Sequence, residues 1–233
     1  MGLKTVFSQR KRKMNNKKLM LLTLFLAILI TTSGAAAFYL STLNKNHSEN
    51  KIRVACVGDS ITNGTQYPAD LWMLLGSTNY TVGNFGVDGS TASLASWNPY
   101  INNSAFQEAK EFKPNIVIIM LGTNDANPLI RTNNGSFVND YVNLVEEFQS
   151  LSCKPKIYLV KPPPIFCNGT TPSAEYFTNN VIPQIEQVAS LTNLPIIDVY
   201  SALANYSELF RDGVHPDEQG AILIAKEIYE SII

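Results

Sequence analysis

Short apolar runs alternate with segments of helical periodicity from Ile52 onward, and this alternation constrains the fold more than any other feature of the 233-residue sequence. Four of the five runs are rich in Val and Ile, and such nearly continuous hydrophobicity is typical of parallel strands buried on both faces. The runs are residues 52–57, 80–85, 116–121, 157–160 and 195–199. The alternation predicts one doubly wound α/β/α domain over residues 52–233, with about five parallel strands.

Two of the other segments carry the apolar stripe of an amphipathic helix. The stripes consist of Phe137, Tyr141, Leu144, Val145, Phe148 and Leu151, and of Ala221, Ile222, Ala225, Ile228, Tyr229 and Ile232. They predict helices over 137–152 and at the end of the chain. A third helical pattern, over 174–191, contains Pro183, which predicts a kink or a helix start near that residue.

The near-neutral net charge of −1 is an average over two unlike regions. Residues 1–18 hold seven positive side chains and no acid, whereas residues 19–233 hold 11 positive and 19 negative ones, a net charge of −8. Contacts to phosphate need clustered Lys and Arg. The acidic body therefore argues against a nucleic-acid partner.

Residues 19–43 form an uncharged run of 25 residues, which as a helix would be about 37 Å long and could cross a bilayer. With basic residues on one flank only, the run predicts a cytoplasmic segment 1–18, a signal-anchor helix 19–43, a polar linker 44–51 and a translocated domain 52–233. The alternative is a signal peptide cleaved near the three alanines at 35–37, which would release the domain. Both interpretations place the domain outside the cytosol, with membrane contact only if the segment stays uncleaved.

Seven N-x-S/T sequons agree with this location and predict a glycoprotein where the host glycosylates. They begin at Asn46, Asn63, Asn79, Asn102, Asn134, Asn168 and Asn205.

Four short polar motifs follow predicted strands or precede the last helix. They are GDSIT at 58–62, NFGVDGS at 84–90, GTND at 122–125 and DGVHP at 212–216. Each alone is an ordinary turn sequence. In doubly wound folds, however, ligands bind at the carboxyl ends of the strands, so the joint placement of the motifs predicts a functional site there.

The motifs contain the groups that nucleophilic catalysis requires. A serine hydroxyl needs a base that is itself oriented by a third group, and Ser60 is the candidate nucleophile. The chain has two histidines, and His47 lies in the linker, so His215 is the candidate base, with Asp212 to orient it. An oxyanion would need donors, for which the candidates are the backbone N–H groups of Ser60 and Gly89 and the side-chain amide of Asn124.

The order and spacing of the four motifs resemble the SGNH (GDSL-type) hydrolase family over residues 52–233. The G-x-S-x-G elbow of α/β-hydrolases is absent, because Thr62 stands two positions after Ser60. The resemblance implies a flavodoxin-like three-layer α/β/α fold and ester hydrolysis without a metal or other cofactor. It also implies Ser60, Asp212 and His215 as the triad, and Gly89, in preference to Gly86, and Asn124 in the oxyanion hole. We expect Asp59 and Asp125 to hydrogen-bond within their own loops.

The finer sequence is similar to the branch that contains sialate and xylan O-acetylesterases, which implies an acylated small molecule or glycan as substrate. The candidate sugar-binding residues are Trp97, Arg131 and Phe166, with Asn98, Tyr100, Asn133 and Tyr176 as further members of the same loops. The alternative is that several of these side chains only pack the loops. A lysophospholipase or thioesterase, an acyl transferase and a catalytically silent glycan-binding module remain alternative functions. No His/Cys cluster has the spacing of metal ligands.

Overall fold

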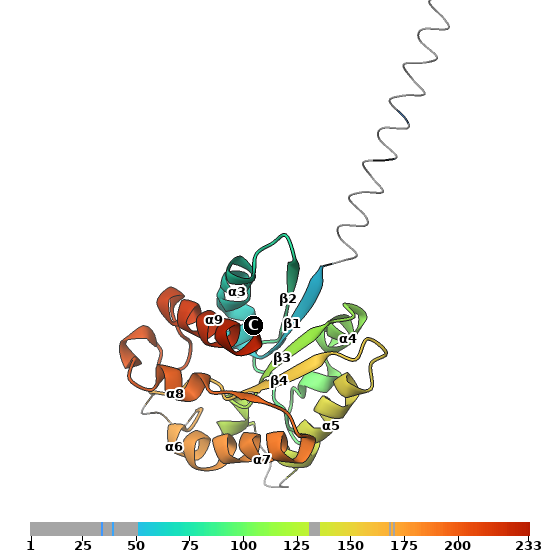
Figure 1. The fold of residues 1–233 in the computed structure, drawn as a ribbon. Coiled ribbons are helices and arrows are strands. Elements are labelled where there is room, and N and C mark those ends of the chain that lie inside the picture. The colour runs from blue at the N-terminus through green and yellow to red at the C-terminus, as the bar shows by residue number, and fades with distance from the viewer. Residues whose placement is uncertain (1–33, 35–38, 40–50, 131–135, 168, 170) are drawn as a thin grey trace, which may run out of the picture. The chain divides into compact units, whose positions relative to one another are not determined.

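The sheet consists of five parallel strands in the order β2-β1-β3-β4-β5 (Figure 1). The computed structural model describes residues 34, 39, 51–130, 136–167, 169 and 171–233. The strands are β1 Ile52–Gly58, β2 Tyr80–Gly86, β3 Ile116–Met120, β4 Lys156–Val160 and β5 Ile196–Ile197. This is the flavodoxin-like order, and it confirms the predicted fold class.

The two central strands explain where a site can form. β1 pairs with β3 in the register Val54↔Ile116 to Gly58↔Met120, and β3 is buried along its whole length. After β1 the chain turns to β2 on one side, and the later strands are added on the other. The order therefore reverses between β1 and β3, and the crevice at their carboxyl ends is where such folds bind ligands.

One face of the sheet is covered by α4 (Ser104–Glu111), α5 (Phe137–Gln149) and α7 (Ile182–Thr192). The rings of Phe106 and Phe148 meet edge to face with centroids 5.5 Å apart, which joins α4 to α5 in this core. α5 begins where the sequence predicts and ends three residues earlier.

The opposite face is covered by α3 (Tyr67–Leu75), α8 (Val199–Leu203) and α9 (Glu218–Ile232), with the short α2 (Ser60–Gly64) at the end of β1. The predicted stripe of the last helix is wrong at one position. Ile222 is 52% exposed, and the buried side instead contains Ile224.

Local hydrogen bonding explains the length of β5 and the position of Pro183. The run 195–199 yields only two strand residues, because the side chain of Asp198 accepts a hydrogen bond from Ser201 N–H and starts α8. Pro183 stands in the first turn of α7, as predicted, where its missing N–H is tolerated. A π-helical segment, Phe177–Val181, and a short α6, Ala174–Tyr176, precede α7.

The described part of the body also contains the 3₁₀ helices Tyr100–Asn102, Asn124–Ala126 and Ser207–Leu209. Residues 51–233 form one compact unit. The predicted anchor, 19–43, lies outside the described residues except for positions 34 and 39. In the described part of the chain, no helix has the length and apolar character that a membrane span needs.

Candidate active site

Ser60 lies at the carboxyl end of β1, as the first residue of α2. Asp59 is the N-cap of this helix, and its Oδ1 accepts a hydrogen bond from Ile61 N–H at 2.9 Å. The cap ends the strand and begins the helix within two residues. The Ser60 side chain is thereby placed at the edge of the sheet between β1 and β3.

His215 lies in a loop that is held from two sides. Oδ1 of Asp212 accepts hydrogen bonds from the backbone N–H groups of Val214 (2.9 Å) and His215 (2.7 Å). Gly213 adopts φ +81°, and a Cβ there would lie 2.6 Å from the backbone nitrogen of Cys167. Only glycine fits this close approach, and it seats the loop against the segment that follows β4.

Ser60, His215 and Asp212 form a continuous hydrogen-bonded series. Oγ of Ser60 lies 2.8 Å from Nε2 of His215, and Nδ1 of His215 lies 2.6 Å from Oδ2 of Asp212. Partial burial raises the pKa of Asp212, but hydrogen bonds from His215 and Val214 outweigh it and lower the pKa to about 2. An ionised carboxylate only accepts, so Nδ1 carries the proton and Nε2 can accept the proton of the Ser60 hydroxyl.

Gly89 differs from Gly86 in the state of its backbone N–H. The N–H of Gly86 donates to Oδ1 of Asn84 at 3.0 Å, whereas within the described chain the N–H of Gly89 has no recorded partner. Gly89 adopts φ +70°, and a Cβ there would lie 3.3 Å from the ring of Trp97. The N–H of Ser60, at the start of α2, is likewise without a recorded partner among the described residues.

Asn124 is tied to both neighbouring loops. Its Nδ2 donates to the carbonyl of Ser90 at 3.0 Å and lies 3.4 Å from Oδ2 of Asp59. The buried Ser90 hydroxyl donates in turn to the carbonyl of Gly58 at 3.3 Å. The bond to Asp59 is the longer and weaker of the two. We therefore expect Asn124 to exchange this bond for one to an oxyanion.

Two buried aspartates hold these loops, and one of them does so differently from the sequence expectation. Asp59 bonds its own loop, as predicted. Asp125 accepts from the backbone N–H groups of Ala92 (3.0 Å) and Ser93 (2.9 Å), so it joins the loop after β3 to the loop after β2. Burial raises the pKa of Asp59 to about 7 and that of Asp125 to about 6, although backbone N–H donors oppose both shifts.

The aromatic candidates for sugar binding lie in different environments. Trp97 is 69% exposed beside Gly89. Phe166 packs against Phe210 with ring centroids 5.0 Å apart. Tyr100 is fully buried and its hydroxyl donates to the carbonyl of Phe85 at 2.7 Å, so a sugar-stacking role for Tyr100 is wrong.

Two further members of that set have contacts within the protein. Asn98 donates to the carbonyl of Asp88 at 3.1 Å, and Tyr176 packs partly buried against the core. Arg131 and Asn133 lie outside the described residues.

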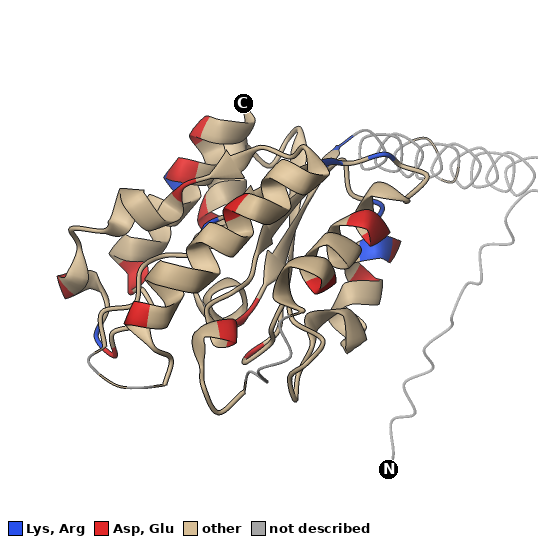
Figure 2. Ribbon diagram, turned by 90° about the horizontal axis from the view of Figure 1, so that it is seen from below, with Lys and Arg blue, Asp and Glu red and all other residues tan. Residues whose placement is uncertain are grey.

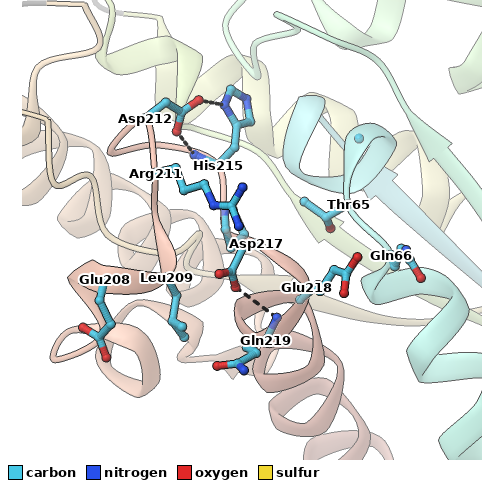
Figure 3. A pocket seen from close by; sticks show the side chains of 13 residues that line it. Thr65, Gln66, Glu208, Leu209, Arg211, Asp212, His215, Asp217, Glu218 and Gln219 are labelled. Atoms are coloured by element: carbon cyan, nitrogen blue, oxygen red, sulfur yellow. Dashed lines mark hydrogen bonds and ion pairs between the residues drawn. The ribbon is translucent and has the colours of Figure 1, made fainter.

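A cavity beside His215 contains functional candidates that the sequence analysis did not identify. It has a volume of about 910 Å³, and Gln66, Arg211 and Glu218 are among its lining residues (Figure 3). Gln66 immediately precedes α3, whereas Arg211 and Glu218 stand on either side of the DGVHP motif, and none of the three belongs to a motif. Proximity to the DGVHP motif was the one signal that could have drawn attention to Arg211.

The site combines a serine, a histidine and an aspartate in hydrogen-bond contact at the carboxyl end of a flavodoxin-like sheet. This arrangement is that of a serine hydrolase. Comparison with known families gives the narrower assignment. The chain belongs to the GDSL-like lipase/acylhydrolase family, whose model matches residues 56–222.

Among characterised proteins, the chain is similar to an acetylxylan esterase of Xylanibacter ruminicola. The two are 33% identical over 210 residues, which cover 79% of this chain and 44% of that protein. The chain thus spans less than half the length of this relative.

Solved structures show the same fold. An acetylxylan esterase from Geobacillus stearothermophilus has a TM-score of 0.63 at 23% identity and covers 78% of this chain and 94% of its own. A lipase/acylhydrolase from Enterococcus faecalis has a TM-score of 0.62 at 23% identity, with coverages of 78% and 95%. A carbohydrate acetylesterase from Sinorhizobium meliloti has a TM-score of 0.63 at 18% identity, with coverages of 78% and 98%.

The substitution Asn124→Ala is expected to lower kcat for ester hydrolysis by on the order of 10²–10³, because it removes one of three oxyanion donors. Steady-state kinetics on a soluble acetyl ester measure the effect. Asn127→Ala, in the same loop, is the matched control and should retain activity close to wild type. If Asn124→Ala also stays within about threefold of wild type, Asn124 does not stabilise the transition state.

Raising the pH from about 4 to about 7 is expected to lower the free energy of unfolding, because folded Asp59 binds its proton more tightly than the unfolded carboxyl, whose pKa is about 3.9. The pKa of about 7 sets an upper limit on the order of 4 kcal/mol. Asp125 lowers the free energy of unfolding in the same direction but by less, as the pH rises to about 6.

Urea unfolding of wild type and Asp59→Asn at several pH values in this window measures this dependence. The asparagine can still cap α2 but cannot ionise, so its stability should fall less with pH. Parallel pH profiles for the two proteins would contradict the assignment to Asp59.

Proposed function

We propose that the protein is a serine carboxylester hydrolase that removes O-acetyl groups from glycans. The contact between Oγ of Ser60 and Nε2 of His215 at 2.8 Å, continued to Asp212, carries this proposal. Similarity to an acetylxylan esterase at 33% identity supports an acetylated glycan as the substrate.

Acylation follows from the roles of these groups. Nε2 of His215 takes the hydroxyl proton while Oγ of Ser60 attacks the ester carbonyl carbon. The N–H groups of Ser60 and Gly89 and the amide of Asn124 stabilise the negative charge that develops on the carbonyl oxygen. His215 then donates its proton to the leaving sugar oxygen as the carbon–oxygen bond breaks, which leaves an acetyl group on Ser60.

Deacylation follows the same steps, with a water molecule as the nucleophile. His215 removes a proton from a water molecule, the resulting hydroxide attacks the acetyl carbon, and the tetrahedral intermediate releases acetate while Oγ of Ser60 regains its proton. Asp212 stays ionised throughout and holds the imidazole in the required orientation, because its pKa of about 2 lies far below neutral pH.

The test compares release of acetate from acetylated xylan with release of fatty acid from a long-chain lysophospholipid and an acyl thioester, using the full chain. We expect acetate release at least 100-fold faster than either acyl-chain reaction. A preference for the long chains would indicate a lysophospholipase or thioesterase instead. A folded protein that binds acetylated xylan without releasing acetate would indicate a glycan-binding module.

We further propose that the domain acts outside the cytosol, held by residues 19–43 or released after cleavage near 35–37. The one-sided basic flank of this uncharged run supports the orientation. Protease treatment of intact cells should degrade residues 51–233 of an anchored protein, and N-terminal sequencing of the mature chain separates the two forms. Complete protection inside intact cells and absence from the medium would contradict the location.

A further inference from the structure

The cavity of about 910 Å³ beside His215 has two walls. One wall consists of residues 64–66, at the end of α2 and the start of α3, and the other consists of the loop around Arg211 and the first turn of α9. Figure 3 shows Arg211 and Glu218 directed toward the wall that carries Thr65 and Gln66. Ser60, Gly89 and Asn124 do not line this space, whereas His215 and Asp212 do.

The chemistry of acylation determines which half of an ester can occupy this space. His215 must pass its proton from Nε2 to the leaving oxygen, so that oxygen has to come within about 3 Å of Nε2. The carbonyl oxygen points instead to the donors at Gly89 and Asn124. Of the residues that act on the ester, His215 borders the cavity, so the alcohol half, whose oxygen has to come next to His215, is the half that can extend into it. The volume of this cavity falls at the upper end of the range of about 300–1,000 Å³ that is common for small-molecule sites.

The residues that line the cavity carry an excess of negative charge. These described residues include four carboxylates (Glu208, Asp212, Asp217 and Glu218) and one cation, Arg211, which gives a net charge of −3 with His215 counted as neutral. Asp212 is engaged by His215, and Asp217 caps α9 through the N–H groups of Gln219 and Gly220. Glu208 and Glu218 have no ion pair within the described chain, so both charges are available to a ligand.

The negative charge of Glu218 also acts on α3. Burial, and then the negative charge of Glu218, raise the pKa of Asp70 on α3, so a further acid lies near the cavity. The positive residues of the body lie mainly elsewhere. Lys51, Arg53, Lys113, Lys154 and Lys156 are at or next to the amino ends of strands, the edge opposite to the site. Figure 2 shows basic residues gathered where the chain enters β1, and acidic residues over the rest of the body.

We propose that this cavity binds the alcohol half of the ester and selects neutral sugars, because its carboxylates repel anionic alcohols such as uronic acids, sialic acids and phosphate-bearing lysolipids. The inference rests on the proposed function and adds the substrate class to it. The side-chain amides of Gln66 and Gln219 offer hydrogen bonds to sugar hydroxyls without adding charge. Arg211 cannot attract an anion effectively, since the surrounding carboxylates outnumber it.

The test uses two esters that differ only in charge: a mono-O-acetylated methyl glucoside and the methyl glucuronide acetylated at the same position. We expect kcat/KM to favour the neutral ester by about tenfold at low ionic strength. The preference should shrink in about 0.5 M salt, where exposed charges are screened within a few ångströms. This comparison needs only the wild-type protein, so no variant has to fold for it to decide.

Charge variants give a second readout. Glu208→Gln combined with Glu218→Gln should lower the preference about three- to tenfold, and Arg211→Gln should raise it. The matched control is Glu230→Gln, 12 residues and about 18 Å further along α9, which should leave the preference unchanged.

The outcomes separate the two levels of the proposal. Equal kcat/KM values for both esters, or a preference that neither salt nor the charge variants alter, would overturn the assignment of the cavity and leave the hydrolase function intact. If neither ester is hydrolysed and acetylated xylan is also inert, the proposed function fails, and the assignment of the cavity fails with it.

Discussion

Replacing Ser60 with alanine is expected to lower kcat for ester hydrolysis by on the order of 10⁴–10⁶, because the acyl-enzyme can no longer form. Stability should change little. Among the described residues, the hydroxyl has one hydrogen-bond partner, the partly exposed His215, and such a bond contributes about 1 kcal/mol. Acetate release and thermal unfolding, measured on the same preparation, separate these two effects.

Ser231→Ala is the matched control for this substitution. The Ser231 hydroxyl lies in the last turn of α9 and donates to the carbonyl of Glu227 at 2.9 Å. Its loss should leave kcat close to wild type. A Ser60→Ala variant that keeps more than about a tenth of the wild-type kcat would show that another group is the nucleophile.

Replacing His215 with alanine is expected to cause a loss of the same order, since a serine hydroxyl at neutral pH is a poor nucleophile without its base. The two residues act as a unit. The double variant Ser60→Ala, His215→Ala should therefore be no slower than the slower of the two single variants.

His47→Ala is the control, because His47 is the other histidine of the chain and stands in the predicted linker. Its kcat should equal that of wild type. Losses that multiply in the double variant would mean that Ser60 and His215 contribute independently, which a shared acyl-transfer mechanism does not allow.

The central strands were the most predictable part of the fold. Val54–Val57 in β1 and Ile116–Met120 in β3 are buried on both faces, and such burial demands the continuous apolar runs visible in the sequence. The short β5 was less predictable. Its run contains enough apolar residues for a longer strand, but the helix cap formed by Asp198 competes with strand pairing.

The candidate site could be predicted from the sequence because its groups stand in short motifs at strand ends and because histidine is rare in the chain. Tertiary contacts between loops could not be predicted in this way. Asp125 joins Ala92 and Ser93 across 33 and 32 positions, and no local rule specifies such partners. The cavity beside His215 depends on such a contact as well, because its charged lining residues all lie within positions 208–218 whereas its other wall, residues 64–66, comes from a distant part of the chain.

Labelling with a fluorophosphonate probe tests most directly whether Ser60 is an activated nucleophile. The full-length protein should be labelled, peptide mapping should place the adduct on Ser60, and Ser60→Ala should show no labelling although it is folded. Well-folded wild-type protein that fails to react, or an adduct on a different residue, would contradict a serine hydrolase mechanism at this site.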